Sequence, residues 1–375
     1  MEIAGSCTPD EHDWTPIHGA EMDTAWKEKM WETEGYLETD NRGRDFGDRE
    51  DLEMESLGTL VLRTCLVCLI VVLEWFMAVR SSLWHEWWTY DGISGPTYWG
   101  VMNRAWSLCS RGRFQSPIDI HPNSLLFDPM LTSIMFPSHK ANGNLTNTGH
   151  DVTLFIDHDI SILMNATAGP LQYQFAISQI KIHYGRQDEK GSEHTINGTH
   201  FSAEVHIMAY NKELYENFTR AAISPGGIAI FAVLCQIGKP GNQAFSKITE
   251  QLSKIRLKGD AVRLEGLPIT TLLPNTHQYM TYEGSFTQPG CQETVTWVVF
   301  NKPIYIQKQE LILFRKIHQV PEDNTDMVLE TNIRPTMPLH NRVVRTNINF
   351  RTQSSTCTMR RRGVYEVNKP FRMGI

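Results

Sequence analysis

Two histidines and a lysine lie at the spacing of a metal site in this chain of 375 residues. Lys181 and His183 are two apart in a predicted strand, 177–184, so both side chains point from the same face of a sheet. His206 lies in a second predicted strand, 201–210. Catalytic zinc takes three deprotonated protein ligands, and an H-x-H pair with a histidine from a neighbouring strand supplies that set. The place of the first histidine is filled by Lys181, whose ammonium group has three donors and no lone pair.

The simplest interpretation of His183 and His206 is therefore that they are core residues with hydrogen-bond partners. Two imidazoles beside an ammonium group fall short of the usual zinc ligand set, and buried polar groups keep partners whether or not a metal is present. A weak metal site is an alternative, because a neutral lysine amine has a lone pair. A small anion pocket lined by the ammonium and the imidazoles is another.

Six longer motifs follow one another between about Trp84 and Phe350. They are WWTYDG (87–92), YWG (98–100), QSPIDI (115–120), GSEHT (191–195), AEVH (203–206) and NIRP (332–335). In this order they resemble the α-carbonic anhydrase family. The resemblance implies a mixed, β-dominated fold with a large, twisted, mostly antiparallel central sheet of about ten strands and short peripheral helices.

The resemblance also assigns roles to single residues. Lys181 occupies the first zinc-ligand position of the family, His183 the second and His206 the third. Gln179 and Glu204 match the residues that orient the first and third ligands. Four further matches belong to the reaction: Thr287, which would hydrogen-bond zinc-bound hydroxide, its acceptor Glu193, His150 at the proton-shuttle position, and Trp297 in the wall of the carbon dioxide pocket.

The loss of one ligand makes the chain similar to the acatalytic carbonic anhydrase-related proteins, in particular the secreted types X and XI, although those tend to lose the ligand at His206 too. This implies no bound cofactor and vestigial roles for His150, Glu193 and Thr287. It implies a protein-binding module whose partner is an extracellular or cell-surface protein such as a neurexin-like receptor. Two alternatives stay open: a zinc-dependent carbonate dehydratase with weak activity, and a structural or matrix ectodomain.

Charge and hydropathy divide the chain into four regions. Residues 1–56 hold 17 acidic against 5 basic residues, a composition typical of disordered segments. Residues 57–79 form the most apolar stretch, and residues 84–350 carry the resemblance. Residues 351–375 hold 6 basic residues against 1 acidic and predict a flexible tail. The central domain is near neutral, which argues against a nucleic-acid groove.

The apolar segment 57–79 has two interpretations. Arg63 and Glu74 interrupt it, and the uncharged core between them is shorter than the roughly 18 residues of a clean membrane span. It fits the core of a signal peptide, but 53 residues precede Met54. Either translation starts near Met54 and the segment is a cleaved signal peptide, or the segment is an internal signal-anchor. Both place the domain in the secretory pathway, secreted or on the extracellular face of a membrane.

Cysteines and glycosylation sequons also indicate the secretory pathway. The resemblance pairs Cys109 with Cys291 in a disulfide of extracellular family members. Cys235 lies in an apolar run and is expected to be a buried thiol. Cys357 is left over in the tail, as an intermolecular thiol or a merely tolerated one. Four N-x-S/T sequons predict a glycosylated surface: Asn144, Asn165, Asn197 and Asn217.

The remaining periodicity favours strands. The runs 151–157, 227–237 and 294–300 are rich in β-branched and aromatic residues. The middle run is apolar on both faces, which predicts a central strand in a covered sheet. Helical spacing appears between Gly241 and Gly259 and again over 310–317.

Overall fold

The computed structural model describes Cys68 and residues 87–157, 165–321 and 327–350. The acidic segment, the apolar segment apart from Cys68, and the basic tail with Cys357 lie outside the described residues. From residue 87 onward the described residues belong to one compact unit. Within the part of the chain that is described, no helix has the length and hydrophobicity that a membrane crossing requires.

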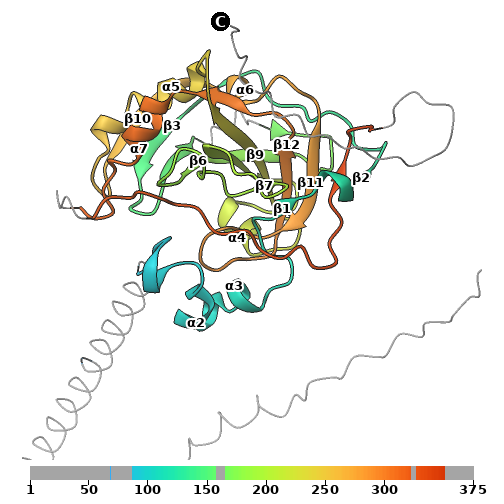
Figure 1. Cartoon of the computed structure of the whole chain (residues 1–375), viewed down its shortest axis with the longest axis horizontal. Coiled ribbons are helices and arrows are strands. Elements are labelled where there is room, and N and C mark those ends of the chain that lie inside the picture. The colour runs from blue at the N-terminus through green and yellow to red at the C-terminus, as the bar shows by residue number, and fades with distance from the viewer. Residues whose placement is uncertain (1–67, 69–86, 158–164, 322–326, 351–375) are drawn as a thin grey trace, which may run out of the picture. The chain divides into compact units, whose positions relative to one another are not determined.

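A mixed sheet of twelve strands forms the centre of this unit (Figure 1). Its strands are β2 (Leu126–Phe127), β3 (Lys140–Asn147), β4 (Val152–Ile156), β5 (Asn165–Ala166), β6 (Phe175–Tyr184), β8 (Ala203–Asn211), β9 (Ile228–Ile237), β10 (Ala261–Pro268), β11 (Tyr279–Gly284), β12 (Val295–Phe300), β13 (Ile304–Ile306) and β14 (Arg345–Thr346). Two further strands, β1 (Asp119–Ile120) and β7 (Thr195–Ile196), form a small parallel sheet of their own.

The order across the large sheet is β10-β3-β4-β6-β8-β9-β12-β11-β14-β2, with β5 beside β6 and β13 beside β9. Only the pairs β9–β12, β9–β13 and β14–β2 are parallel. The prediction of a β-dominated fold with a large, mostly antiparallel sheet is confirmed, with two strands more than the ten expected. The predicted strands at 151–157, 227–237 and 294–300 are β4, β9 and β12.

The sheet has an apolar core on each face. Ile230 and Phe231 are neighbours on β9, yet Ile230 packs into one core and Phe231 into the other, because successive side chains of a strand alternate in direction. On β6 the same alternation sends Ile180 and Ile182 into the core that contains Phe231. Lys181 and His183 therefore lie on the opposite face.

The helices are short and lie outside the sheet (Figure 1). They are η1 (Gly92–Ser94), α2 (Trp99–Met102), η2 (Arg104–Trp106), α3 (Leu108–Arg111), η3 (Pro122–Ser124), α4 (Phe218–Ala222), α5 (Gln243–Thr249), η4 (Leu252–Lys254), α6 (Ile269–Leu272) and α7 (Lys308–Phe314). The helical spacing between Gly241 and Gly259 corresponds to α5 and η4. The Asn242 side chain caps α5 by accepting a hydrogen bond from the Phe245 N–H at 3.0 Å.

A third apolar cluster joins the N-terminal helices to the domain. Tyr90, Trp99 and Trp106 pack around the Cys109–Cys291 disulfide, which confirms the predicted pairing. The guanidinium of Arg334 is buried beneath the cluster and donates to the Cys109 carbonyl oxygen at 3.0 Å. The disulfide and this buried arginine fix the N-terminal helices to the rest of the domain.

Candidate functional site

Three adjacent central strands bring the candidate ligands together. In the register of the sheet, Lys181 on β6 lies opposite His206 on β8 and opposite Thr153 on β4. His183 is two residues further along β6, and its ring centroid is 4.3 Å from that of His206. The sequence spacing therefore corresponds to a real cluster, buried on one face of the sheet.

Lys181 is bound to a carboxylate that the sequence motifs do not identify. Its Nζ donates to Asp151 Oδ2 at 2.7 Å and to Gln288 Oε1 at 2.9 Å. The hydroxyls of Thr148 and Thr153 donate to the other oxygen of Asp151, at 2.9 and 2.5 Å. Burial by itself raises the pKa of Asp151, but the Lys181 ammonium and the hydroxyl donors outweigh it and hold that pKa well below its usual range. The structure thus has an internal ion pair at the first ligand position.

Each histidine uses one nitrogen in a hydrogen bond. His183 Nδ1 donates to the Asn332 carbonyl oxygen at 2.7 Å, and its buried Nε2 has no hydrogen-bond partner. His206 Nε2 lies 2.8 Å from Glu204 Oε1 and donates to it. Burial, and then the neighbouring His206, lower the pKa of His183 to about 3. Burial also lowers the pKa of His206. Both rings are therefore neutral near pH 7, with one imidazole lone pair each.

These residues do not fit the three-ligand zinc site of the family. Two imidazole lone pairs remain, as that site requires, and Asn332 and Glu204 hold the rings from behind. The third position holds an ammonium whose hydrogens are directed to Asp151 and Gln288. An ammonium has no lone pair to give a metal, and its charge repels a cation.

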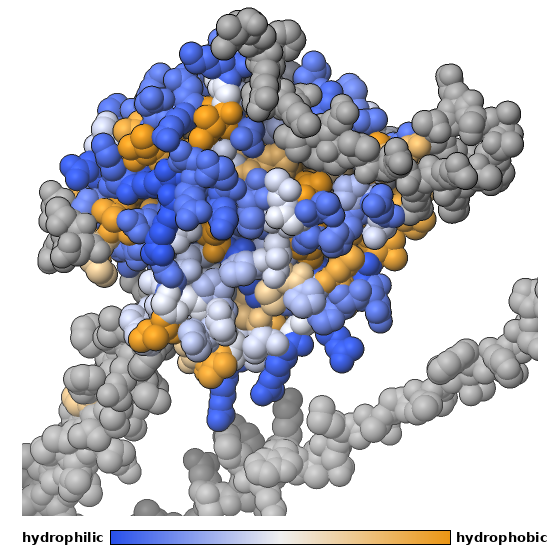
Figure 2. Space-filling view, viewed as in Figure 1, coloured by the Kyte–Doolittle hydropathy of each residue, from blue (hydrophilic) through white to orange (hydrophobic). Residues whose placement is uncertain are grey.

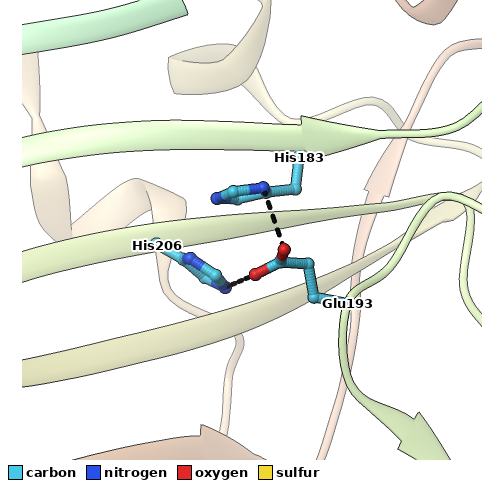
Figure 3. A group of neighbouring side chains, drawn as sticks. All are labelled: His183, Glu193 and His206. Carbon is cyan, nitrogen blue, oxygen red and sulfur yellow. Dashed lines mark ion pairs between the residues drawn. The ribbon is translucent and has the colours of Figure 1, made fainter. Parts of the chain in front are cut away.

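A carboxyl group does lie close to both histidines. Glu193 Oε1 is 3.6 Å from His183 Nδ1, and Glu193 Oε2 is 3.9 Å from His206 Nε2 (Figure 3). These are the nitrogens already used for Asn332 and Glu204. Figure 3 shows the other nitrogen of His183, the one without a partner, on the side of the ring away from Glu193. Glu193 therefore does not complete a ligand set with the free lone pairs.

The protonation state of Glu193 differs from the ionised carboxylate that would accept a hydrogen bond from Thr287 when Thr287 positions a hydroxide. Burial, and then repulsion from Glu204, raise the pKa of Glu193 well above its usual range, against the hydrogen bonds from Thr287 and from the Arg334 N–H. A raised pKa favours the protonated carboxyl. The predicted pair of Thr287 and Glu193 is thus present as a contact, within a buried network.

The other predicted site residues surround this cluster. Gln179 is half-buried on β6, and the hydrogen bonds of the Lys181 ammonium go to Asp151 and Gln288 instead of to it. His150 stacks on Trp88, with ring centroids 3.9 Å apart. Trp297 is buried with its ring edge-on to His206 at 4.9 Å.

Asp151, Gln288, Asn332 and His194 belong to the site but are absent from the sequence-based set. His194 Nδ1 donates to Glu204 Oε1 at 2.7 Å, so Glu204 accepts from two imidazoles. A usable signal existed for Asp151. It follows His150 directly and begins the predicted strand 151–157, and a lysine buried in a core requires a carboxylate partner.

The glycosylation sequons differ in exposure. Asn144, Asn197 and Asn217 are exposed. Asn165 is half-buried on β5, and its side-chain oxygen is buried without a hydrogen-bond partner. Cys235 is a buried free thiol whose pKa is raised by burial, as the apolar run around it suggests.

Comparison with known proteins gives the same family as the motifs. Residues 94–348 match the eukaryotic-type carbonic anhydrase family. Carbonic anhydrase-like protein 2 of Caenorhabditis elegans is 38% identical over 272 residues, which cover 71% of this chain and 81% of that protein. Carbonic anhydrase-like protein 1 of the same organism is 32% identical over 345 residues, which cover 74% of this chain and 94% of that protein. The chain belongs to the eukaryotic-type carbonic anhydrase family.

Proposed function

We propose that this protein is a non-catalytic, extracellular member of the family that acts by binding another protein. The observation that carries the proposal is the buried ion pair between Lys181 and Asp151 at the first ligand position. Hydration of carbon dioxide in this family relies on zinc to lower the pKa of bound water to about 7. An ammonium paired with its own carboxylate supplies neither a ligand nor that water.

Zinc stoichiometry tests the loss of the metal directly. Elemental analysis of the purified wild type is expected to find no stoichiometric zinc, whereas a Lys181→His variant regains a third imidazole and is expected to hold about one zinc per chain. Lys181→Arg is the matched control, because it restores no lone pair and is expected to stay empty. Stoichiometric zinc in the wild type would sink the proposal, and carbon dioxide hydration would then be assayed.

One observation favours a second candidate, a weak zinc-dependent carbonate dehydratase. His183 Nε2 is buried without a partner, and a bound metal would satisfy it. The test is hydration activity in the wild type that a chelator removes and added zinc restores. Activity that persists unchanged in Lys181→Arg and in a His183→Gln variant would come from a contaminating enzyme.

The extracellular assignment is supported by the disulfide and by three exposed sequons. By resemblance to the secreted acatalytic members, the proposed partner is a neurexin-like receptor on a cell surface, and a matrix or structural role is the competing assignment. Surface substitutions distinguish the receptor-binding role from the structural role, because a receptor-binding module no longer captures its receptor when its binding face is changed. A Cys357→Ser variant tests whether that capture depends on a disulfide formed by the tail.

A further inference from the structure

The surface formed by η1, α2, η2 and α3 combines exposed apolar side chains with arginines. Val101 is 79% exposed and Ile93 is 77% exposed, and they lie with other exposed apolar side chains on this one stretch of the chain. We call this surface the N-terminal face. It consists of the exposed residues Ile93, Tyr98, Val101, Arg104, Leu108, Arg111, Arg113 and Phe114. Figure 2 shows hydrophobic and hydrophilic residues side by side at the lower edge of the domain, where Figure 1 draws α2 and α3.

The charged side chains of the N-terminal face are all arginines, and two carboxylates border it: Asp91, which caps η1 and pairs with Arg186, and Glu293, which accepts a hydrogen bond from the Phe114 N–H at 2.7 Å. Between residues 92 and 114 the sequence holds Arg104, Arg111 and Arg113 and no aspartate or glutamate. None of the three arginines forms an ion pair within the described residues, although other exposed arginines such as Arg186 and Arg263 do. Uncompensated arginines beside aromatic rings attract an anionic ligand and can stack or fork onto its carboxylates.

The N-terminal face is held rigidly. The disulfide between Cys109 and Cys291 and the aromatic cluster of Tyr90, Trp99 and Trp106 lie beneath it. A Cβ on Gly100 would lie 2.4 Å from Ser110 Oγ, so the absence of a side chain lets α2 pack directly against α3. A surface that is already ordered loses little conformational entropy on binding.

We infer that the N-terminal face is the binding surface for an acidic segment of a partner protein that also carries an aromatic or aliphatic anchor. The inference rests on the proposed protein-binding function and names its surface. Arginine and aromatic residues are enriched at protein interfaces, and the exposed apolar groups here exceed what a bare polyanion would need. The three arginines give the charge complementarity, and Tyr98, Val101 and Leu108 give the apolar contact.

Defined polymers serve as probes because the partner is not identified. Binding of fluorescent poly(Glu,Tyr), polyglutamate and heparin to the purified full chain is measured by anisotropy at low and high salt. A variant with Arg104→Glu, Arg111→Glu and Arg113→Glu is expected to bind poly(Glu,Tyr) about tenfold more weakly or worse. The matched control reverses three exposed lysines elsewhere, Lys239→Glu, Lys302→Glu and Lys316→Glu, and is expected to bind as the wild type does.

A second variant separates the apolar contribution from the charge. The double variant Val101→Ser, Leu108→Ser is expected to bind poly(Glu,Tyr) more weakly than the wild type and to bind polyglutamate equally well. The basic tail is present in every variant, so its contribution cancels. Circular dichroism and an intact Cys109–Cys291 bond establish that each variant is folded.

Two results would overturn the inference. If the arginine and lysine variants have the same poly(Glu,Tyr) affinity, the N-terminal face is not the site. The wild type could instead bind heparin but not poly(Glu,Tyr), with heparin binding lost in the arginine variant. That result would assign the surface to a sulfated glycan. Neither result depends on zinc, so the metal-content test still decides the non-catalytic assignment separately.

Discussion

Removing either partner of the Lys181–Asp151 pair is expected to destabilise the fold far more than removing both. The side chain of Lys181 is 11% exposed and that of Asp151 is 3% exposed, so either variant, Lys181→Met or Asp151→Ala, leaves a charge buried without its partner. The charges are 2.7 Å apart, which at an effective dielectric constant of about 20 gives an attraction of about 6 kcal/mol before desolvation is subtracted. Breaking a buried pair on one side costs about 3 to 5 kcal/mol.

The double variant removes both charges together and the desolvation cost of each. We expect its free energy of unfolding to lie within about 2 kcal/mol of the wild type, which makes the coupling energy of the cycle about 4 kcal/mol or more. The coupling energy is measured by urea unfolding of all four proteins at pH 7, monitored by tryptophan fluorescence. The exposed pair of Arg263 and Asp157 gives a matched control cycle, and its coupling is expected to be much smaller because solvent screens it.

The pH dependence provides an independent check. The folded-state pKa of Asp151 lies below its unfolded value of about 4, so its stabilising contribution is present above pH 4 and is lost as pH falls through the folded pKa. In Lys181→Met the carboxylate has lost its ammonium partner and protonates at higher pH. The difference in the free energy of unfolding between the wild type and Lys181→Met is therefore expected to become smaller as pH is lowered. If the losses in free energy of unfolding of the two single variants sum to the loss in the double variant, Lys181 and Asp151 do not act as a pair and the account of the site fails.

Three further outcomes are expected from other parts of the fold. Cys109→Ser opens a bond between residues 182 apart, and we expect it to lower the free energy of unfolding by about 2 to 5 kcal/mol, measured by denaturant unfolding without reductant. Glycopeptide mass spectrometry of secreted protein should find glycan on the exposed sequons but not on Asn165, and occupancy there would mean that β5 opens before it pairs. Arg334→Met leaves the carbonyl oxygens of Cys109 and Ser116 without their buried donor, so thermal unfolding should occur at a clearly lower temperature, whereas an unchanged midpoint would mean that water replaces the guanidinium.

The central strands could be predicted from sequence because their periodicity is strong. β9 is apolar on both faces, and only a central strand of a covered sheet has that pattern. The short edge strands could not be predicted. β2 and β14 have two residues each and form only because β14 pairs with both β11 and β2, which depends on neighbours more than sixty residues away in the chain.

The histidines of the site could also be predicted, but the partner of Lys181 could not. Spacing alone places Lys181 and His183 on one face of β6. Asp151 lies thirty residues earlier, just before β4, and Gln288 lies in the loop after β11. Only the order β4-β6 in the sheet and the path of that loop bring the three side chains together. A family motif supplies such contacts only where the chain follows the family, and at Lys181 it does not.

The polar groups around the site have partners without any metal, which explains how they persist beside a lysine. Glu204 accepts from His206 and from His194, so its removal would leave two imidazole N–H groups buried and unpaired. His183 donates to the Asn332 carbonyl oxygen, and its removal would leave that oxygen without this donor. Among the described residues of this network, two buried atoms have no hydrogen-bond partner, His183 Nε2 and Glu193 Oε2. Because burial lowers the pKa of His183 to about 3, this nitrogen stays neutral at pH 7, and its lost hydrogen bond costs far less than a buried charge would. Retention of the network is thus accounted for by folding and is not evidence for carbon dioxide hydration.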